Sequence, residues 1–340
     1  MGATRFLTKM QTEILKLNAD SVEKAKNLLL NGEVVAIPTE TVYGLGAIGL
    51  NPTAVKKIFE IKGRPSDNPL IAHVHEDYDL SKLVHIEKGY AKKLIKEFTP
   101  GPLTLVFYSK GVVCDEATCG GKTLAVRIPE HKGARQLLKA VNQPIVAPSA
   151  NLSKHTSPVT ANHVYNDLNG KVKLILDGGK CKGGIESTVL DCTGEVPRIL
   201  RAGLITKEMI ERVCGACEIA EHKDGDEVKS PGVKYTHYQP KCQTALFYES
   251  ELESAKSLYN NYLSQGKVPY IMCQTAFDKE FKGYNILSLG ESEYDMANNL
   301  YDKLLEGETK ADIIIAVAFE RYDGVYLGVM NRLKKSCGRL

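Results

Sequence analysis

The sequence predicts an α/β protein with two domains, a larger one on a twisted mixed sheet and a smaller one on a parallel sheet. Its 340 residues are a typical length for two domains. Short apolar segments bounded by glycine or proline alternate with segments whose apolar residues recur at helical spacing. A charged run at residues 221–229 and a Ser-Pro-Gly turn interrupt this alternation. We therefore expect one domain at residues 1–220, a linker at 221–241 and a second domain at 242–340.

The larger domain is expected to contain many short strands. Val34–Ile37 lies between Gly32 and Pro38 and is typical of a buried strand. Some strands follow one another directly, whereas others are joined by helices, so the sheet should be mixed. Further strands are expected at residues 70–74, 103–108, 124–128, 145–147, 172–176, 187–191 and 198–200, and helices after Pro52, around 91–98 and 134–141, and from 206.

The smaller domain shows a more regular alternation of strands and helices. Strands are expected at 244–248, 268–273 and 312–319, and helices at 252–263, 294–305 and around 329–335. A βαβαβα order requires crossover connections, which join parallel strands. The pattern therefore predicts a small Rossmann-like parallel α/β domain.

Charge and composition exclude several classes of protein. Lys and Arg total 44 against 41 Asp and Glu, a net charge of +3, which is unlike a strongly basic nucleic-acid coat protein or an acidic disordered tail. The longest apolar run, residues 313–319, is too short to cross a bilayer. Nine cysteines are scattered along the chain, and no apolar leader precedes them. We expect a reduced, cytoplasmic protein that does not enter a membrane.

The segment after the first predicted strand, residues 38–46, combines hydroxyls, a carboxylate and glycines. Such a strand end suits a small polar ligand, although a glycine-rich turn would explain the same residues. Gly44, Gly46 and Gly49 match the dinucleotide fingerprint G-x-G-x-x-G. That fingerprint opens a helix directly from a strand, whereas here Pro52 delays the helix. A nicotinamide site is therefore not favoured.

A pair of cations, Lys62 and Arg64, gives a sharper signal. Pro65 disfavours the helical region for Arg64, and in an extended segment residues i and i+2 face the same way. Such a pair suits phosphate oxygens, with the alternative of a solvated helix end. The chain has no Walker sequence, so a nucleoside triphosphate would be held by side chains of this kind.

Other candidates follow or lie within predicted strands. Ser149 and Asn151 follow the strand at 145–147, where open sheets bind ligands, although a simple Ser or Asx turn fits equally. Arg127 lies inside a strand and needs a carboxylate partner from the protein or from a substrate. His73-x-His75 lacks further ligands for zinc, and Cys214-x-x-Cys217 lacks a second pair. No metal site is predicted.

Together these motifs resemble the YrdC-like threonylcarbamoyl-adenylate synthases in their long, two-domain form. The resemblance covers the whole chain and implies a YrdC-like twisted sheet with helices and a central cleft. In the linker, Val233 and Thr236 stand where the family usually has Met and Arg. The matching motifs are residues 38–45, Lys62-Gly-Arg64-Pro65, Ser149-Ala-Asn151, Ser187-Thr188-Val189, the linker at 230–240 and Met330-Asn331-Arg332-Leu333.

The resemblance implies a nucleotidyltransferase that converts ATP, L-threonine and bicarbonate to threonylcarbamoyl-AMP and pyrophosphate, with Mg²⁺ accompanying the ATP. It assigns a catalytic tetrad of Lys62, Arg64, Ser149 and Asn151. L-Threonine is assigned to Thr41, His73, Arg127, Ala147 and Ser187, and ATP to Lys62, Arg64, Asn68, Thr123, Ser149, Ser157, Arg201 and Tyr235.

The expected biological context is tRNA modification. The resemblance implies that the product passes to a tRNA threonylcarbamoyl transferase complex, which builds threonylcarbamoyladenosine. Lys234, Tyr235, His237 and Tyr238 in the linker suit docking over a nucleotide better than a flexible spacer does, so the linker is expected to act as a lid. An RNA-binding or nucleotide-sensing regulatory protein that uses the same cleft is the alternative; direct tRNA binding is left open.

Overall fold

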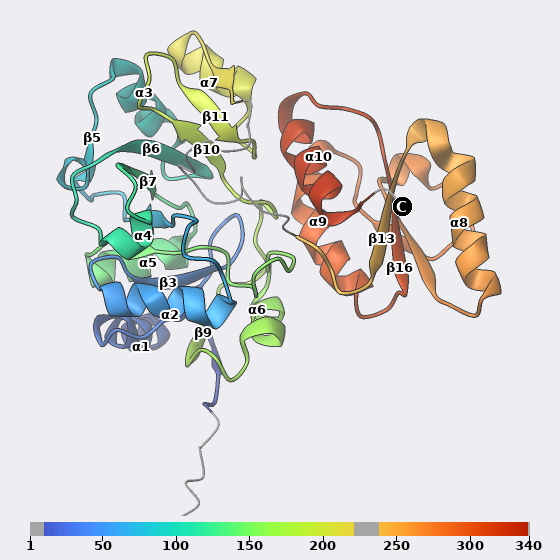
Figure 1. Cartoon of the computed structure of the whole chain (residues 1–340), viewed down its shortest axis with the longest axis horizontal. Coiled ribbons are helices and arrows are strands. Elements are labelled where there is room, and N and C mark those ends of the chain that lie inside the picture. Colours follow the sequence, from blue (N-terminus) through green and yellow to red (C-terminus); the bar gives the residue numbers. More distant parts are fainter. Residues whose placement is uncertain (1–9, 221–237, 339–340) are drawn as a thin grey trace, which may run out of the picture.

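The computed structural model describes residues 10–220 and 238–338 and contains two sheets, each with its own helices (Figure 1). The larger sheet has twelve strands among these residues, in the order β1-β9-β2-β3-β8-β4-β7-β6-β10-β11-β12, with β5 paired to β6. Its strands are β1 (Glu13–Lys16), β2 (Val35–Ile37), β3 (Gly44–Ile48), β4 (Ile71–His73), β5 (Val84–His85), β6 (Leu103–Ser109), β7 (Thr123–Arg127), β8 (Ile145–Val146), β9 (Leu174–Asp177), β10 (Thr188–Asp191), β11 (Arg198–Arg201) and β12 (Glu218–Ile219).

The larger sheet is mixed, as predicted. β4 and β7 run parallel, whereas β2 and β3, β3 and β8, and β6 and β7 are antiparallel. Helices pack around it, with α1 against α5 and α3 against α7. They are α1 (Ala19–Leu30), α2 (Pro52–Lys62), α3 (Gly89–Phe98), α4 (Asp115–Thr118), α5 (Lys132–Val141), α6 (Ala161–Leu168) and α7 (Lys207–Cys214), with a 3-10 turn at Leu80–Lys82.

The smaller sheet is all-parallel, with the order β13-β16-β14-β15. In Figure 1, α8 lies on the side of this sheet away from the larger domain, and α9 and α10 lie on the side toward it. The strands are β13 (Gln243–Tyr248), β14 (Pro269–Cys273), β15 (Ile286–Ser288) and β16 (Ile313–Ala318), and the helices are α8 (Leu252–Ser264), α9 (Glu293–Gly307) and α10 (Gly324–Ser336), with 3-10 turns at Glu249–Glu251 and Thr275–Phe277.

Helix α2 ends in a way that decides where two candidate site residues point. Asn51 caps its first turn by accepting a hydrogen bond from the Ala54 amide, and Pro52 occupies the first helical position. At the other end Gly63 adopts a left-handed conformation with φ of 58°, and the Arg64 amide donates to the Phe59 carbonyl. This is the glycine-terminated helix end of the Schellman type.

The fold class predicted from the sequence is confirmed, with differences in individual elements. β3 begins at Gly44 and takes up the end of the segment 38–46, for which a glycine-rich turn was one of our two interpretations, so no helix opens from Gly44. β15, α1 and α6 were not predicted. The interdomain boundary stays a prediction, since residues 221–237 lie outside the described part. No helix in the described residues is long and apolar enough to cross a membrane.

Candidate active site

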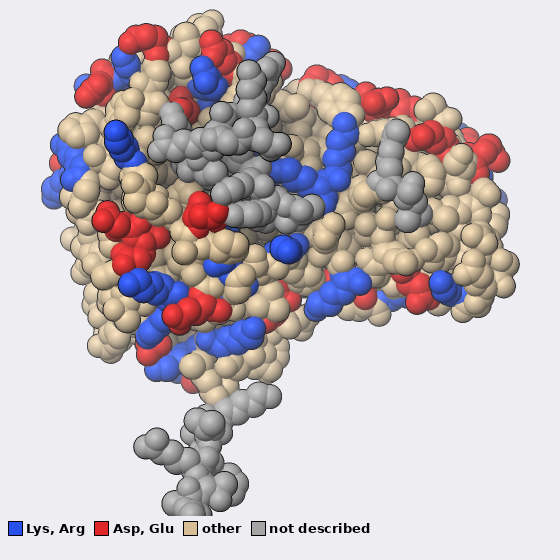
Figure 2. All heavy atoms as spheres, in the orientation of Figure 1, with Lys and Arg blue, Asp and Glu red and all other residues tan. Residues whose placement is uncertain are grey.

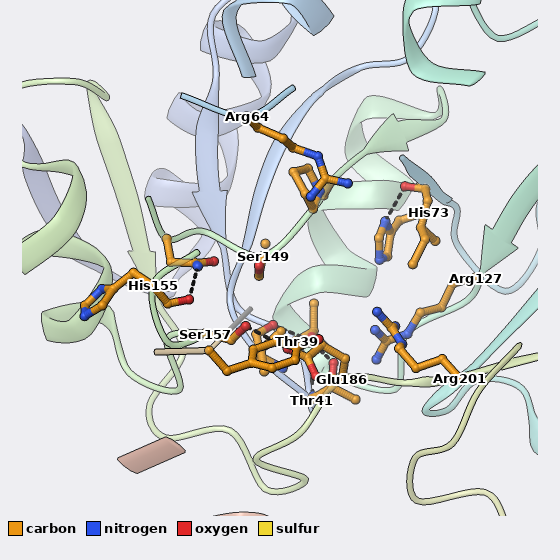
Figure 3. Close-up of a pocket in the computed structure, with 17 residues that line it drawn as sticks. Thr39, Thr41, Arg64, His73, Arg127, Ser149, His155, Ser157, Glu186 and Arg201 are labelled. Atoms are coloured by element: carbon orange, nitrogen blue, oxygen red, sulfur yellow. Dashed lines mark hydrogen bonds between the residues drawn. The ribbon is translucent and has the colours of Figure 1, made fainter. Parts of the chain in front are cut away.

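A pocket lies where several strands of the larger sheet end, and segments far apart in the sequence meet there (Figure 3). In this view Arg127 and Arg201 approach from one side, His155 and Ser157 lie on the other, and Arg64 enters between them. The described residues that line it are Thr39, Thr41, Val42, Gly44, Arg64, Ile71, His73, Arg127, Ala147, Pro148, Ser149, Asn151, His155, Ser157, Glu186, Arg201 and Tyr238.

Arg127, the last residue of β7, has a protein carboxylate as its partner. Its Nη2 lies 2.6 Å from Oε1 of Glu40, and both side chains are buried. Burial alone would raise the pKa of the Glu40 carboxyl, but Arg127 and the surrounding amides outweigh it and hold the pKa below its usual value. Glu40 therefore stays ionised beside Arg127. From the sequence we expected a carboxylate partner for Arg127, from the protein or from a substrate. In the structure Glu40 is such a partner, and it lies 87 positions away in the sequence.

His73, at the end of β4, supplies a neutral imidazole to the pocket. Burial, followed by the nearby Arg127, lowers the pKa of His73 to about 3. Its Nδ1 lies 3.0 Å from the Ile71 carbonyl oxygen, so in the neutral ring Nδ1 donates the proton. Nε2 then carries the lone pair and can accept a hydrogen bond from a ligand.

Lys62 is not among the described residues that line the pocket, and its assignment to the phosphates stays a prediction. Its Nζ donates to the carbonyl oxygens of Ser149 and Asn151, each at 2.5 Å, and lies 3.4 Å from Oδ1 of Asn151. The extended conformation that we expected is absent, because Lys62 is still helical and Gly63 turns the chain. Lys62 therefore points under the loop at 149–151, whereas Arg64 points into the pocket.

Arg64 lies next to a buried amide with unused hydrogen-bonding groups. Its Nη2 donates to the Asn68 carbonyl oxygen at 3.1 Å. The side-chain oxygen and nitrogen of Asn68, which is 1% exposed, have no hydrogen-bond partner in the described residues. A buried amide with neither group satisfied is costly unless a ligand or water completes it.

The loop after β8 is held by polar contacts on both sides. Asn151 Nδ2 donates to the carbonyl oxygen of His155 at 2.6 Å. The His155 ring lies between two carboxylates, with Nδ1 2.7 Å from Asp167 and Nε2 2.8 Å from Glu308 of the smaller domain. Burial would lower the pKa of His155, but these hydrogen bonds outweigh it and raise the pKa to about 9. His155 is therefore a cation at neutral pH.

Glu186 is the meeting point of the two domains within the pocket wall. Its carboxylate accepts hydrogen bonds from Ser157, from Tyr301 of α9 and from Arg332 of α10. Arg332 and Tyr301 are completely buried. Burial would raise the pKa of Glu186, but Arg332 and Arg201 hold it below its usual value. The two helices of the smaller domain thus help to fix the position of Ser157.

The structure brings together most of the predicted site residues, but not all. Ser187 lies behind the pocket, with its Oγ 2.8 Å from the Thr104 hydroxyl and accepting from Arg201. Tyr235 lies outside the described residues. The predicted residues that line the pocket are Thr41, Arg64, His73, Arg127, Ala147, Ser149, Asn151, Ser157 and Arg201, whereas Lys62, Asn68, Thr123 and Ser187 do not.

Sequence reasoning missed several features that shape the site. Thr39 was not singled out, yet it lines the pocket, and its hydroxyl lies 2.9 Å from that of the predicted Thr41. Tyr238, which we expected to dock over a nucleotide, lines the pocket, but its stacking on Tyr301 was not predicted. Glu40 lies in the segment 38–46 that we noted, and Glu186 directly precedes the Ser187-Thr188-Val189 motif, but their arginine partners are far away in sequence, and no local pattern indicates such a pair.

Both domains of the chain match known protein families. Residues 27–203 match the family model described as "Telomere recombination", and residues 205–338 match "Threonylcarbamoyl-AMP synthase, C-terminal domain". The threonylcarbamoyl-AMP synthase of Bacillus subtilis is 42% identical, over 96% of this chain and 96% of its own length. The chain belongs to the threonylcarbamoyl-AMP synthase family.

Members of this family are nucleotidyltransferases that act in the threonylcarbamoyladenosine modification of tRNA, and this chain is such a synthase in the long, two-domain form. The synthase of Pyrococcus abyssi is 40% identical over 92% of this chain and 93% of its own. The crystal structure of P. abyssi Sua5 complexed with L-threonine matches with a TM-score of 0.89 at 38% identity, covering 96% of this chain and 98% of that one. The similarity therefore extends over both domains.

The pocket of this synthase is rich in cations and poor in available carboxylates. Among the described lining residues Glu186 is the carboxylate, and its two oxygens already accept from Ser157, Tyr301 and Arg332. No group of three or more His, Cys, Asp or Glu in the described chain could hold a metal ion. An anionic ligand, rather than a metal held by protein carboxylates, fits these residues.

Proposed function

We propose that this pocket binds ATP and L-threonine side by side and joins them through bicarbonate to form threonylcarbamoyl-AMP. The observation that carries the proposal is the convergence of Arg64, Arg127 and Arg201 with the neutral His73 in one pocket. Three cations suit the phosphates and the amino-acid carboxylate, which bind arginine through charge-assisted hydrogen bonds. A structure of the P. abyssi relative carries L-threonine, which supports the choice of amino acid.

L-Threonine is assigned to the end of the pocket at β4 and β7. Arg127 pairs with its carboxylate, and Nε2 of His73 accepts a hydrogen bond from its amine. Thr41 and Ala147 line the same pocket, and Ala147 directly follows β8, the strand that pairs with β4. Ser187 acts from behind by accepting a hydrogen bond from Arg201, rather than by touching threonine.

ATP is assigned to Arg64, Ser149, Asn151 and Ser157, with Arg201 reaching it from the side of Arg127 (Figure 3). The unsatisfied amide of Asn68 beside Arg64 supports this, because a nucleotide could supply the missing partners. Thr123 and Tyr235 remain proposed contacts from the family resemblance. Lys62 acts as a positioning residue that holds the loop of Ser149 and Asn151 from below.

The chemistry asks the protein mainly to position reactants and to stabilise charge. The threonine amine and bicarbonate form a carbamate with loss of water, and a carbamate oxygen then attacks the α-phosphorus and releases pyrophosphate. Arginines fixed in a buried pocket stabilise the charge that develops on the phosphates without having to reorganise. Mg²⁺ accompanying the ATP would supply further charge neutralisation.

The linker is proposed to cover the loaded site. Tyr238, one of the described residues of the linker, lines the pocket, and the Tyr238 carbonyl accepts a hydrogen bond from Thr156 at 3.1 Å. Covering the pocket would keep water from the reactive intermediate. The product would then pass to a tRNA threonylcarbamoyl transferase.

Separate binding measurements test the assignment of the two ends. Arg64→Met should weaken ATP binding by about tenfold or more and leave threonine binding within about twofold, because one charge-assisted contact contributes about 1.5–3 kcal/mol. Arg127→Met should weaken threonine binding by about tenfold or more and leave ATP binding within about twofold. Isothermal titration calorimetry of each ligand alone, with a non-hydrolysable ATP analogue as the nucleotide, measures the affinities for threonine and for the nucleotide. Equal losses for both ligands in both variants would contradict the assignment.

A further inference from the structure

Glu40 is a buried carboxylate that touches the pocket only through another residue. It is 7% exposed and stands behind Arg127, outside the set of described residues that line the pocket. Its Oε1 accepts from Arg127, while its Oε2 accepts from the backbone amides of Glu130 at 3.0 Å and His131 at 3.3 Å. One carboxylate thus ties the guanidinium of Arg127 to the chain that leads into α5.

The ion pair between Glu40 and Arg127 offsets the free-energy cost of burying a positive charge in the pocket wall. Arg127 is 5% exposed, and an unpaired buried guanidinium is destabilising by several kcal/mol. Glu40 neutralises it without occupying all its donors: the Nε of Arg127 has no hydrogen-bond partner in the described residues. Since a guanidinium has five N–H donors, a second carboxylate can bind on the pocket side.

The position of Glu40 also limits how Arg127 can move. A long arginine side chain loses considerable conformational entropy when it is fixed. If the folded protein already holds the side chain in place, ligand binding does not carry this entropic cost, and the ligand binds more tightly. Oε2 is anchored to two rigid amides at the start of α5, so the plane of the Arg127 guanidinium is set before a ligand arrives.

We infer that Glu40 is a positioning residue of the threonine site, which orients Arg127 for the substrate carboxylate. This inference rests on the proposed assignment of Arg127 to threonine. It predicts an effect confined to one substrate. A purely structural role in the fold would instead lower the stability and affect both substrates alike.

The test compares Glu40→Gln with Glu76→Gln in pyrophosphate release assays, varying threonine and ATP separately. Glu76 pairs with Arg135 at 2.7 Å on the surface, so this control removes a similar ion pair away from the pocket. Glu40→Gln should raise the KM for threonine by about 10- to 100-fold, the effect of one charge-assisted hydrogen bond, and change the KM for ATP by less than about twofold. Glu76→Gln should change neither.

Two further variants keep the inference open to refutation. Glu40→Asp retains the charge but is one methylene shorter, so it should recover part of the threonine affinity. In an Arg127→Met background Glu40→Gln should have no additional effect on threonine binding, because the residue it positions is gone. Thermal unfolding confirms that each variant is folded.

The outcomes separate the inference from the proposal on which it rests. If Arg127→Met raises the KM for threonine and a folded Glu40→Gln does not, the positioning role is wrong and the threonine site stands. If Glu40→Gln raises both KM values equally, or acts equally in the Arg127→Met background, the role is also wrong. If Arg127→Met leaves threonine binding unchanged, the threonine assignment fails and the inference fails with it.

Discussion

Lys62 and Arg64 are two positions apart in one motif, yet their side chains point to different places and have different roles. Within the described residues the hydrogen bonds of the Lys62 ammonium go to oxygens of the loop at 149–151, and its side chain is buried. Burial, followed by repulsion from Arg64, holds the pKa of Lys62 well below its ordinary value. Arg64 lies in the pocket wall and presents its charge there. The difference follows from one left-handed glycine between them.

A pair of variants distinguishes these roles. Lys62→Met should lower the free energy of unfolding by about 1–3 kcal/mol, because the carbonyls of Ser149 and Asn151 lose a buried donor. Arg64→Met should leave thermal stability almost unchanged while it weakens ATP binding. Denaturant unfolding followed by fluorescence or circular dichroism measures the first effect. A Lys62→Met variant as stable as the parent chain would show that the lysine is not a support for the loop.

At the scale of elements, the sequence predicted strands and helices where periodicity was strong, and it failed where tertiary contacts decide. Strands such as β6 and β16 were predicted within one or two residues because their apolar runs are long. β3 was missed because its glycines resemble a loop. A Cβ at Gly46 would lie 2.9 Å from the Ile145 side chain, so close packing between β3 and β8 requires glycine there.

The same distinction holds for the site. Thr41, Ser149 and Asn151 lie near strand ends, and this local signal marked their segments as candidates, whereas the family resemblance assigned their roles. Glu40 and Glu186 could not be predicted in their roles, because their partners lie 87 and 146 positions away. The extended conformation expected at Lys62 is absent, although a glycine directly after a helix is a recognised C-terminal signal.

At the scale of the whole molecule, α9 and α10 of the smaller domain contribute to the pocket region of the larger one (Figure 1). Arg332 and Tyr301 reach Glu186, and Glu308 reaches His155. On the face drawn in Figure 2, basic and acidic side chains are interspersed, in keeping with the net charge of +3. In the pocket, by contrast, Arg64, Arg127 and Arg201 converge.

The His155–Glu308 contact predicts a pH-dependent stability of the assembled domains. Folding raises the pKa of His155 from 6.5 to about 9, which corresponds to up to about 3 kcal/mol. This contribution is complete below about pH 6.5 and is lost as the pH rises through about 9. Glu308→Gln removes one of the two carboxylates responsible. The difference in Tm between the parent chain and Glu308→Gln should therefore be largest near pH 6.5 and shrink by pH 10.

Glu306→Gln is the matched control for this measurement. Glu306 also lies near the end of α9, but its partners are Lys303 and Lys310 rather than a histidine. The difference in Tm between the parent chain and Glu306→Gln should therefore be constant from pH 6.5 to 9. A Glu308→Gln difference that is equally constant over this range would contradict the charged state assigned to His155.

The most direct test of the central claim is pyrophosphate release from ATP, with threonine and bicarbonate each omitted in turn. Mass spectrometry of the complete reaction identifies the nucleotide product. A pocket that joins the three substrates should release pyrophosphate at full rate only when all are present, with threonylcarbamoyl-AMP formed in equal amount. Release that persists without threonine, or a product that lacks the threonyl group, would contradict the account.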